Sequence, residues 1–433
     1  MDYTLILYNE DSLEDLAYRG AIEYLLSELK YPKEISKFTF NPSKVIRGLV
    51  VDKQEGALLK INRFGYVKAA LYGHSFLERD QLKRKYQDFT VHFNDSRFEV
   101  FPTMFNLALG CLYSDLVELG NLKKTYEELF LEVTEAINEI HRNGYLKSRI
   151  ISDPARYVRK EPELIDTLLM FKSFGKSLAL VTNSEWDYTD QIMKFVCQDF
   201  LGKLKNWSDL FEVVVVDAQK PDFFSGNNKF YEVISQSGHL KNVTGGLKKG
   251  GIYQGGNSKE IEKLFQVSPS QILFVGDHIY SDVYQSKRSC RWRTMLVIHE
   301  LEEDLLAAKG AHSHLASIEE LMKEKEELEL NVDVLKMEEK GCLLRKDPFH
   351  QNPKDLPLLR EEIKKIDESV RVEILEFEKN FNIHWGELMW AGNDQSYLGM
   401  AIERYACVYT SRVSNFLNYS PVHYFRPKLK TYF

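Results

Sequence analysis

The stretch SQILFVGDHIYSD, residues 270–282, contains a short run of apolar residues that ends in Gly276 and Asp277. KSLALVTNS at 176–184 and FEVVVVDAQKP at 211–221 have the same form. Short, continuous runs of Val, Ile and Leu are typical of strands that are buried on both faces of a parallel sheet. Helix-like segments such as YTDQIMKFVCQDFL and SKEIEKLF separate these runs. The pattern therefore predicts an α/β fold with a parallel sheet.

The regions on either side have other patterns. Residues 103–142 have helical periodicity, and RGLVVDKQEGALLKINRFGYV (47–67) predicts a β-hairpin that turns at Gly56. Residues 317–380 predict an antiparallel helical hairpin, whose charges are most simply a solvated helix face. Its apolar positions have near-heptad spacing before the break HQNPKDLP and recur beyond it: Ile318, Leu321, Leu328, Val332, Leu335, Ile363, Ile366, Val370 and Phe377.

These patterns give a domain plan for the chain. We expect the start of the core at 1–10, a cap insertion that binds substrate at 11–150, and the main core at 151–315. The charged helical hairpin is expected at 316–385, and a C-terminal helix that packs on the core at 386–433.

Composition excludes several classes of protein. With 433 residues, 44% of them hydrophobic, the chain can bury a large core. A net charge of -7 gives no general attraction to nucleic acid, and no window approaches the 18 apolar residues of a membrane helix. No signal peptide is recognisable, and the cysteines lack the C-x-x-C spacing of a zinc site or a disulfide framework: Cys111, Cys197, Cys290, Cys342 and Cys407. We expect a cytoplasmic protein.

Polar residues follow the apolar runs, where a parallel sheet binds its ligands. They are Thr182, Asn183 and Ser184 after LALV, Lys220 after VVVVDAQ, and Asp277 and Asp282 after ILFVG, together with Asp2 and Thr4 in the first segment, MDYTLILYN. Hydroxyl and amide groups suit phosphate oxygens, and a lysine neutralises charge. Carboxylates with a phosphate suit Mg²⁺.

Each of these residues also has an ordinary structural explanation. Thr182 and Asn183 could cap a helix, Lys220 could be a surface lysine, and Asp282 could be a helix N-terminal charge. Asp277 is harder to explain in this way, because a carboxylate at the end of a buried strand is costly unless a cation meets it. The ordered set favours a shared phosphate and metal site.

The same order occurs in the haloacid dehalogenase-like phosphohydrolases, and the chain resembles one branch, the cytosolic purine 5′-nucleotidases that act on IMP and GMP. The similar stretches run from end to end: MDYTL, RGLVVD, GALLKINRFG, VTNSEWDYTD, VDAQKPDFF, GIYQGGNS, GDHIYSDV, CRWRT, RYACVY and PVHYFR. The resemblance implies a Rossmann-like haloacid dehalogenase core with a parallel sheet, a mainly helical cap insertion, a protruding helical hairpin and a homo-oligomer.

The resemblance also implies a two-step phosphoryl transfer through an aspartyl-phosphate. Asp2 matches the acid that protonates the leaving oxygen, then activates water, and gives its backbone carbonyl to Mg²⁺. Asp277 matches the metal carboxylate, and Asp282 a supporting acid. Lys220 matches the lysine that steadies the phosphoryl charge.

Other matched positions bind the substrate. Thr182 and Asn183, with Ser184 beside them, match the phosphate-binding loop. Phe105 matches the aromatic that holds the nucleotide, and His141 and Lys147 match a polar pair on a helix. By themselves, Phe105 and His141 could equally be packed core residues.

Of three departures from the family, two concern the site. The nucleophilic Asp would precede Met1 by one residue, so we expect a longer natural chain in which a central strand ends in that Asp. Thr134 and Asn138 stand where the purine enzymes carry an Arg and an Asp, which predicts looser selection among purines, with Asn138 still near the substrate.

The leading hypothesis is a Mg²⁺-dependent 5′-nucleotidase for purine nucleoside monophosphates, with phosphate transfer to a nucleoside as a further option. One rival is a catalytically silent relative that binds nucleotide or a protein partner. The other is a phosphatase of the same fold with a non-nucleotide substrate. Mg²⁺-dependent phosphate release from a panel of phosphate esters separates the three.

Overall fold

The computed structural model describes residues 1–202, 204–235, 238–340 and 356–425. Its contacts fall into two compact units. Unit 1 contains residues 1–301 together with the described residues from 388 onward, and unit 2 contains the described residues of 302–387.

The apolar runs at 176–184 and 211–221 form neighbouring parallel strands, as predicted. In β8 (Ala179–Val181) and β9 (Val213–Val216), Leu180 pairs with Val214, and β12 (Gly251–Gly255) continues the parallel arrangement on the other side of β9. No residue of β9 is more than 1% exposed, which explains why its sequence is a continuous run of valines. β10 (Phe230–Val233) and β11 (Leu240–Asn242) extend this sheet in antiparallel fashion.

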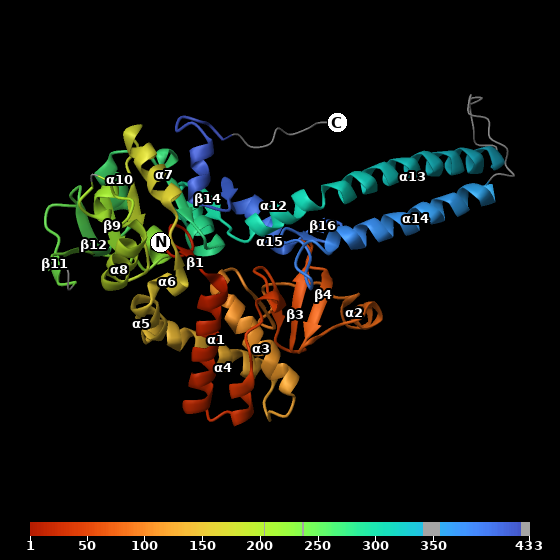
Figure 1. Ribbon diagram of the computed structural model, residues 1–433, viewed down its shortest axis with the longest axis horizontal. Helices are drawn as coiled ribbons and strands as arrows, with labels where there is room; N and C mark the ends of the chain where they lie inside the picture. The colour runs from red at the N-terminus through yellow and green to blue at the C-terminus, as the bar shows by residue number, and fades with distance from the viewer. Residues whose placement is uncertain (203, 236–237, 341–355, 426–433) are drawn as a thin grey trace. The chain divides into compact units, whose positions relative to one another are not determined.

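The run at 270–282 starts a second parallel sheet, in which β13 (Leu273–Gly276) pairs with β14 (Arg293–Val297). β14 pairs in turn with β17 (Val408–Thr410). Helices accompany both sheets (Figure 1), so the mixed α/β class is confirmed. These helices are α7 (Pro162–Ser173), α8 (Trp186–Cys197), α9 (Asp222–Ser225), α10 (Ser258–Phe265) and α11 (Gln285–Cys290).

A cavity of about 400 Å³ separates the edge strands of the two sheets. Residues 178–181 line it from β8 and the position before it, residues 273–275 line it from β13, and Met1 and Leu5 also belong to its lining. Among the described residues, β8 pairs only with β9, and β13 only with β14. Leu273 is 45% exposed although it belongs to a parallel strand. Two parallel edges therefore lie on either side of a mainly apolar space.

The first residues form a tight turn next to this cavity. The carbonyl of Met1 accepts hydrogen bonds from the backbone N–H groups of Thr4, Leu5 and Ile6. β1 (Leu7–Tyr8) then pairs with β7 (Val158–Arg159) in antiparallel fashion.

Residues 10–157, called here the N-terminal region, combine helices with an antiparallel sheet. The predicted hairpin forms β2 (Val50–Asp52) and β3 (Ala57–Ile61), and Gly56 in the turn has a φ of +70°. The sequence reading missed the rest of this sheet, β4 (Val67–Tyr72), β5 (Ser75–Phe76) and β6 (Phe98–Val100). The helices are α1 (Glu10–Ser27), α2 (Arg79–Tyr86), α3 (Leu107–Leu119), α4 (Tyr126–Arg142), α5 (Tyr145–Ser152) and α6 (Pro154–Tyr157).

The expectation of one C-terminal helix over 386–433 is wrong. Helix α15 spans only Tyr397–Tyr405, and the next residues form β17 because they pair with β14. A 3₁₀-helix follows at Val413–Asn418, and a small ladder, β15 (Trp390–Ala391) with β16 (Asp394–Gln395), precedes α15. Residues 426–433 lie outside the described part of the chain.

Unit 2 consists mainly of two paired helices, α13 (His312–Glu339) and α14 (Leu356–Glu378) (Figure 1). Lys325 contacts Asp367 at 2.6 Å and His314 contacts Glu373 at 2.7 Å, which is an antiparallel register. Val332, Leu335 and Leu359 form the seam, partly as the heptad spacing predicted. Most of the sequence break at 350–357, and Cys342, lie outside the described residues. α12 (Leu301–Gly310) precedes this pair.

Two further observations concern membrane-spanning helices and disulfide bonds. Within the described ranges, none of the helices is both long and apolar enough to cross a bilayer. The four cysteines that the structure describes are free thiols, three of them buried.

Candidate active site

Acidic and hydroxyl side chains meet beyond the carboxyl ends of β8 and β13. The Asp2 carboxylate accepts hydrogen bonds from Ser184 Oγ at 2.6 Å and from the Tyr8 hydroxyl at 2.5 Å. The hydroxyl of Thr4 donates to Asp277 Oδ1 at 3.1 Å. The Asp2–Thr4 turn therefore connects the loops that follow two different sheets.

A buried ion pair lies beside this turn. Lys220 Nζ is 2.7 Å from Asp282 Oδ1, and their side chains are only 10% and 4% exposed. Burial alone would raise the pKa of Asp282, but the charge and hydrogen bond of Lys220 hold it below its usual value. Gly276 makes room for this acid, because a Cβ there would lie 2.4 Å from Asp282 Oδ2. The glycine before Asp277 is thus a steric requirement of the ion pair.

Asp277 is a desolvated acid that lies near a second acid, Asp282. Burial and the neighbouring charge of Asp282 raise the pKa of Asp277 to about 6. Arg47 Nη1 donates to the Asp277 carbonyl at 3.1 Å, and Arg47 is itself held by Glu300, with Nη2 2.7 Å from Oε2. Sequence reasoning missed Arg47. Its signal was a lone arginine directly before the apolar run GLVV.

The loop after β8 is organised by its own side chains. The Asn183 side chain accepts from the backbone N–H of Lys220 at 2.7 Å and donates to its carbonyl at 3.0 Å. Thr182 Oγ1 accepts from the N–H of Ser184 at 3.1 Å. The side chain of Asn183 is thus engaged with the Lys220 loop, and it fixes the position of that lysine.

On the side of α3 and α4, two predicted substrate contacts lie together. The ring centroid of Phe105 lies 5.5 Å from that of His141 and 4.9 Å from that of Tyr3. His141 Nδ1 is 2.7 Å from the carbonyl of Ile137, so Nδ1 carries the proton. Burial lowers the pKa of His141, and its Nε2 has no hydrogen-bond partner among the described residues. A buried acceptor of this kind suits a donor on a ligand.

The other predicted residues are less directly placed. Lys147 pairs with Glu185, with Nζ 2.6 Å from Oε2, next to the loop after β8. Thr134 donates to the carbonyl of Phe130 within its own helix at 2.7 Å, and Asn138 is exposed on the same helix. Thr134, Asn138 and His141 have the spacing of one face of α4.

A magnesium ion fits the acids of this site. Among the described residues, no group of three or more His, Cys, Asp and Glu is arranged to hold a metal. Mg²⁺ needs fewer protein ligands, since it is usually bound by one or two carboxylates together with phosphate and water. Asp277 can supply one carboxylate, and the backbone carbonyl of Asp2 can supply a further oxygen.

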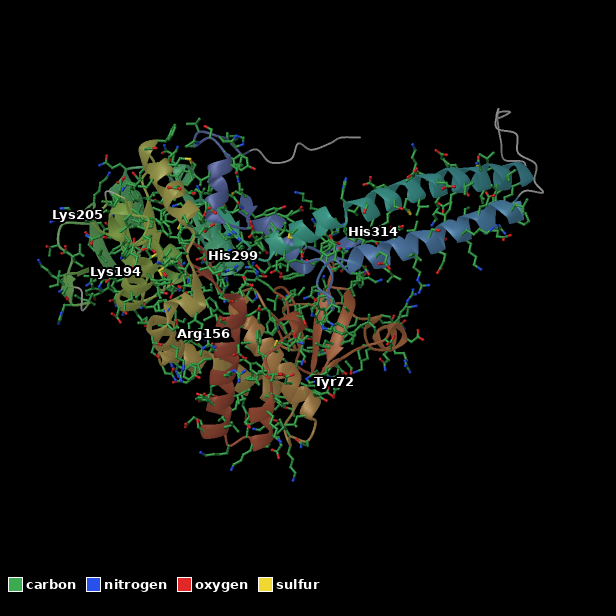
Figure 2. All side chains as sticks on the ribbon, viewed as in Figure 1. Tyr72, Arg156, Lys194, Lys205, His299 and His314 are labelled. Carbon is green, nitrogen blue, oxygen red and sulfur yellow. The ribbon has the colours of Figure 1, made fainter. Side chains whose placement is uncertain are left out.

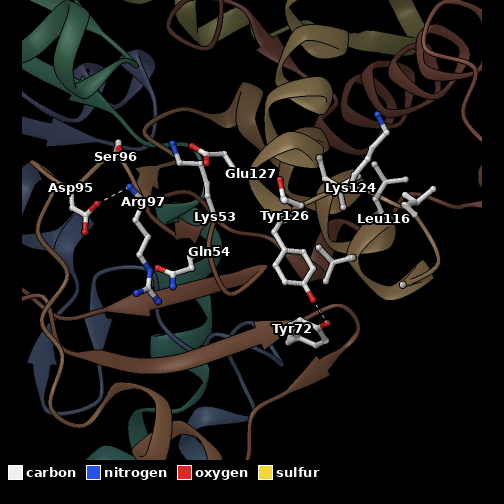
Figure 3. Close-up of a pocket in the computed structure, with 15 residues that line it drawn as sticks. Lys53, Gln54, Tyr72, Asp95, Ser96, Arg97, Leu116, Lys124, Tyr126 and Glu127 are labelled. Atoms are coloured by element: carbon white, nitrogen blue, oxygen red, sulfur yellow. Dashed lines mark hydrogen bonds between the residues drawn. The ribbon is translucent and has the colours of Figure 1, made fainter.

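A second cavity, of about 690 Å³, lies within the N-terminal region between the loop after β2 and the start of α4 (Figure 3). The Tyr72 and Tyr126 hydroxyls are 2.6 Å apart on its wall. Arg97 forms a bidentate pair with the buried Asp52, and Lys124 pairs with Glu132. Its acids Asp95 and Glu127 face the same space, so the lining has no clear charge preference.

The fold is mixed α/β, and polar side chains gather at the carboxyl ends of its parallel strands. The model of the 5′ nucleotidase family matches residues 1–432, so the chain belongs to that family. A 5′-nucleotidase domain-containing protein of Dictyostelium discoideum is 28% identical over 427 residues, which cover 96% of this chain and 68% of the relative. Family membership confirms the resemblance drawn from the sequence, and it implies a hydrolase of phosphate monoesters with nucleoside monophosphates as substrates.

Proposed function

We propose that this protein is a Mg²⁺-dependent 5′-nucleotidase that hydrolyses purine nucleoside 5′-monophosphates of the IMP and GMP kind through an aspartyl-phosphate. The observation that carries the proposal is the gathering of Asp2, Thr182, Lys220 and Asp277 from separate segments beyond the ends of β8 and β13. Bound Mg²⁺, held by Asp2 and Asp277, would neutralise charge on the phosphate oxygens.

Residues of the chain bind the phosphoryl group, transfer the proton and hold the nucleoside. Lys220 supplies a positive charge to the phosphoryl group, and Thr182 and Ser184 offer hydroxyls or backbone N–H groups to its oxygens. Asp2, which two hydroxyls hold in place, donates a proton to the leaving oxygen and later accepts one from water. Phe105 offers a face to the base, and His141 Nε2 accepts a hydrogen bond from the nucleoside.

The proposed core is of the haloacid dehalogenase type, with the N-terminal region as its cap. Such a core has a strand between β8 and β13, parallel to both, that ends in the nucleophilic Asp directly before Met1. The mainly apolar cavity between the two edges supports this proposal. Because buried backbone groups need partners, a strand there would hydrogen-bond to both edges and join the two sheets.

The test is phosphate release from IMP, GMP, AMP and a sugar phosphate, with and without Mg²⁺. It uses a chain that carries this strand and the Asp. Release from purine nucleotides only with Mg²⁺ is expected. Binding of nucleotide without release would favour a silent relative, and release from the sugar phosphate alone would favour another substrate class. The proposal also includes phosphate transfer to a nucleoside, which competition between water and added nucleoside tests. It includes a cytoplasmic location, tested by cell fractionation, and a homo-oligomer, tested by light scattering.

A further inference from the structure

Glu14 is a buried acid that the proposed reaction does not use. It lies on α1 and is only 2% exposed. Burial raises its pKa to about 7, although hydrogen bonds from Ala108 and Tyr3 favour the charged form. An acid in such a place is costly to the fold unless its contacts compensate.

Both oxygens of Glu14 have partners, one in the Asp2–Thr4 turn and one in the first turn of α3. Oε1 accepts from the Tyr3 hydroxyl at 3.2 Å. Oε2 accepts from the backbone N–H of Ala108 at 3.0 Å. Ala108 is in the first turn of α3, where N–H groups lack partners inside the helix and a negative charge is favourable.

Together with the contact between the rings of Tyr3 and Phe105, the two hydrogen bonds of Glu14 form a closed ring. Its four members are Glu14, Tyr3, Phe105 and Ala108. Tyr3 stands between Asp2 and Thr4, and Phe105 stands three residues before Ala108. The rings of Tyr3 and Phe105 are in edge contact, with centroids 4.9 Å apart. Glu14 therefore connects the turn that carries Asp2 to the wall that carries Phe105 by a path that does not pass through the ligand.

The turn at Tyr3 needs external support. Tyr3 has a φ of +47°, in the left-handed region that non-glycine residues rarely adopt. His299, labelled in Figure 2, follows β14, and its Nε2 lies 2.9 Å from the Tyr3 carbonyl. Glu14 holds the other end of the same residue, its hydroxyl. Together they fix a strained residue whose neighbours on both sides contact the loops after the sheets.

We propose that Glu14 is a positioning residue that sets the distance between the Asp2–Thr4 turn and Phe105, and thereby the affinity for the nucleoside part of the substrate. The inference rests on the proposed function. It assigns a role in substrate selection to a side chain that does not touch substrate. Loss of Glu14 should therefore weaken the binding of a whole nucleotide more than the binding of phosphate alone.

Calorimetric titration with Mg²⁺ and either IMP or inorganic phosphate measures this difference. In Glu14→Ala, IMP affinity should fall about tenfold, because two hydrogen bonds are lost, whereas phosphate affinity should stay within about twofold. Glu14→Gln should keep most of the IMP affinity, since its amide can bond both Tyr3 and the N–H of Ala108. Tyr3→Phe removes one bond and should cost about two- to fivefold in IMP affinity.

A matched control is Asp115→Asn, which alters another buried acid, on α3 itself. Asp115 is bound by Lys44 at 2.8 Å and by the hydroxyl of Tyr18, and it has no contact with Tyr3 or Phe105 among the described interactions. Its substitution should change stability and leave the ratio of IMP to phosphate affinity unchanged.

The inference is overturned if Glu14→Ala and Tyr3→Phe leave that ratio unchanged, or if Asp115→Asn alters it equally. Tyr3→Phe removes only a hydroxyl group, so this variant still tests the inference if Glu14→Ala does not fold. The proposed function fails separately: in that case the unsubstituted protein binds no IMP, which the first titration shows before any variant is compared.

Discussion

Lys220, in the loop after β9, forms an ion pair with Asp282, in the π-helix Ile279–Tyr284 after β13, with Nζ 2.7 Å from Oδ1 and both side chains almost completely buried. Because a buried charge without its partner is strongly destabilising, Lys220→Met should lower the free energy of unfolding by about 3–5 kcal/mol. Lys220→Met with Asp282→Asn should recover part of that loss. Urea unfolding of unit 1, followed by tryptophan fluorescence, measures both. A double variant as unstable as the sum of the two single variants would show that the pair is not coupled.

In the chain that carries the added strand and the nucleophilic Asp, Asp277→Asn should remove most Mg²⁺-dependent turnover, because the variant no longer supplies the metal with a negative charge. We expect a loss of at least about 100-fold in kcat, with a far-UV circular dichroism spectrum like that of the unsubstituted protein. Titration of the variant with Mg²⁺ should show weaker metal dependence. Unchanged turnover would eliminate Asp277 as a metal ligand.

Glu14 should make stability depend on pH. Burial raises its pKa from 4.5 to about 7. The contribution of protonated Glu14 to the free energy of unfolding is therefore fully present below pH 4.5 and is lost as the pH rises through 7. This shift corresponds to about 3 kcal/mol. Tyr3 and Ala108 are the groups that bond its carboxyl, and neither titrates in this range.

The melting temperature of Glu14→Gln, measured relative to that of the unsubstituted protein, should therefore rise as the pH increases from 5 to 8. Asp11→Asn, an exposed acid on the same helix, is the control and should show no such trend. Parallel pH curves for Glu14→Gln and the unsubstituted protein would mean that Glu14 ionises normally.

An extension directly upstream of Met1 tests the cavity between β8 and β13. About six apolar residues that end in Asp are enough for a strand. The extended protein should melt at a higher temperature and should take up labelled phosphate from a nucleotide. An identical extension that ends in Asn should keep the higher melting temperature and take up none. If neither extension raises the melting temperature, the cavity does not accept a strand.

The base preference tests the neutral residues of α4. Thr134 is engaged with its own helix and Asn138 is exposed, so neither presents a charge to a base. In the chain that carries the nucleophilic Asp, we expect similar kcat/KM for IMP and AMP, and a clear preference for IMP after Thr134→Arg with Asn138→Asp. A strong preference for IMP in the unsubstituted protein would contradict this explanation.

The strands that carry the site could be predicted from the sequence, because short continuous runs of Val, Ile and Leu are typical of strands buried on both faces of a sheet. The residues after them, such as Lys220 and Asp277, could be predicted with them, since the carboxyl ends of parallel strands share one edge. Arg47 and Glu14 could not be predicted, because each is defined by partners far away in the sequence.

The error at the C-terminus has a similar cause. The stretch RYACVYT (404–410) directly follows the helical pattern of α15, and its sequence does not reveal that β14 has an open edge. Val408, Tyr409 and Thr410 are residue types that favour strands, so the pairing with β14 agrees with their local preference. β4 to β6 were missed because short strands in a polar context give a weak periodic signal.

Helix α13 has 28 residues, so it is about 42 Å long. Most of its described contacts are made with α14, and the two helices belong to a unit whose contacts gather within residues 302–387. Insertions or deletions of whole turns that occur in both helices together would keep the seam in register and add no new partner. Such changes can accumulate during evolution without any adjustment of the chemistry in unit 1. Family members should therefore differ in length here far more than in the loops that follow the sheets.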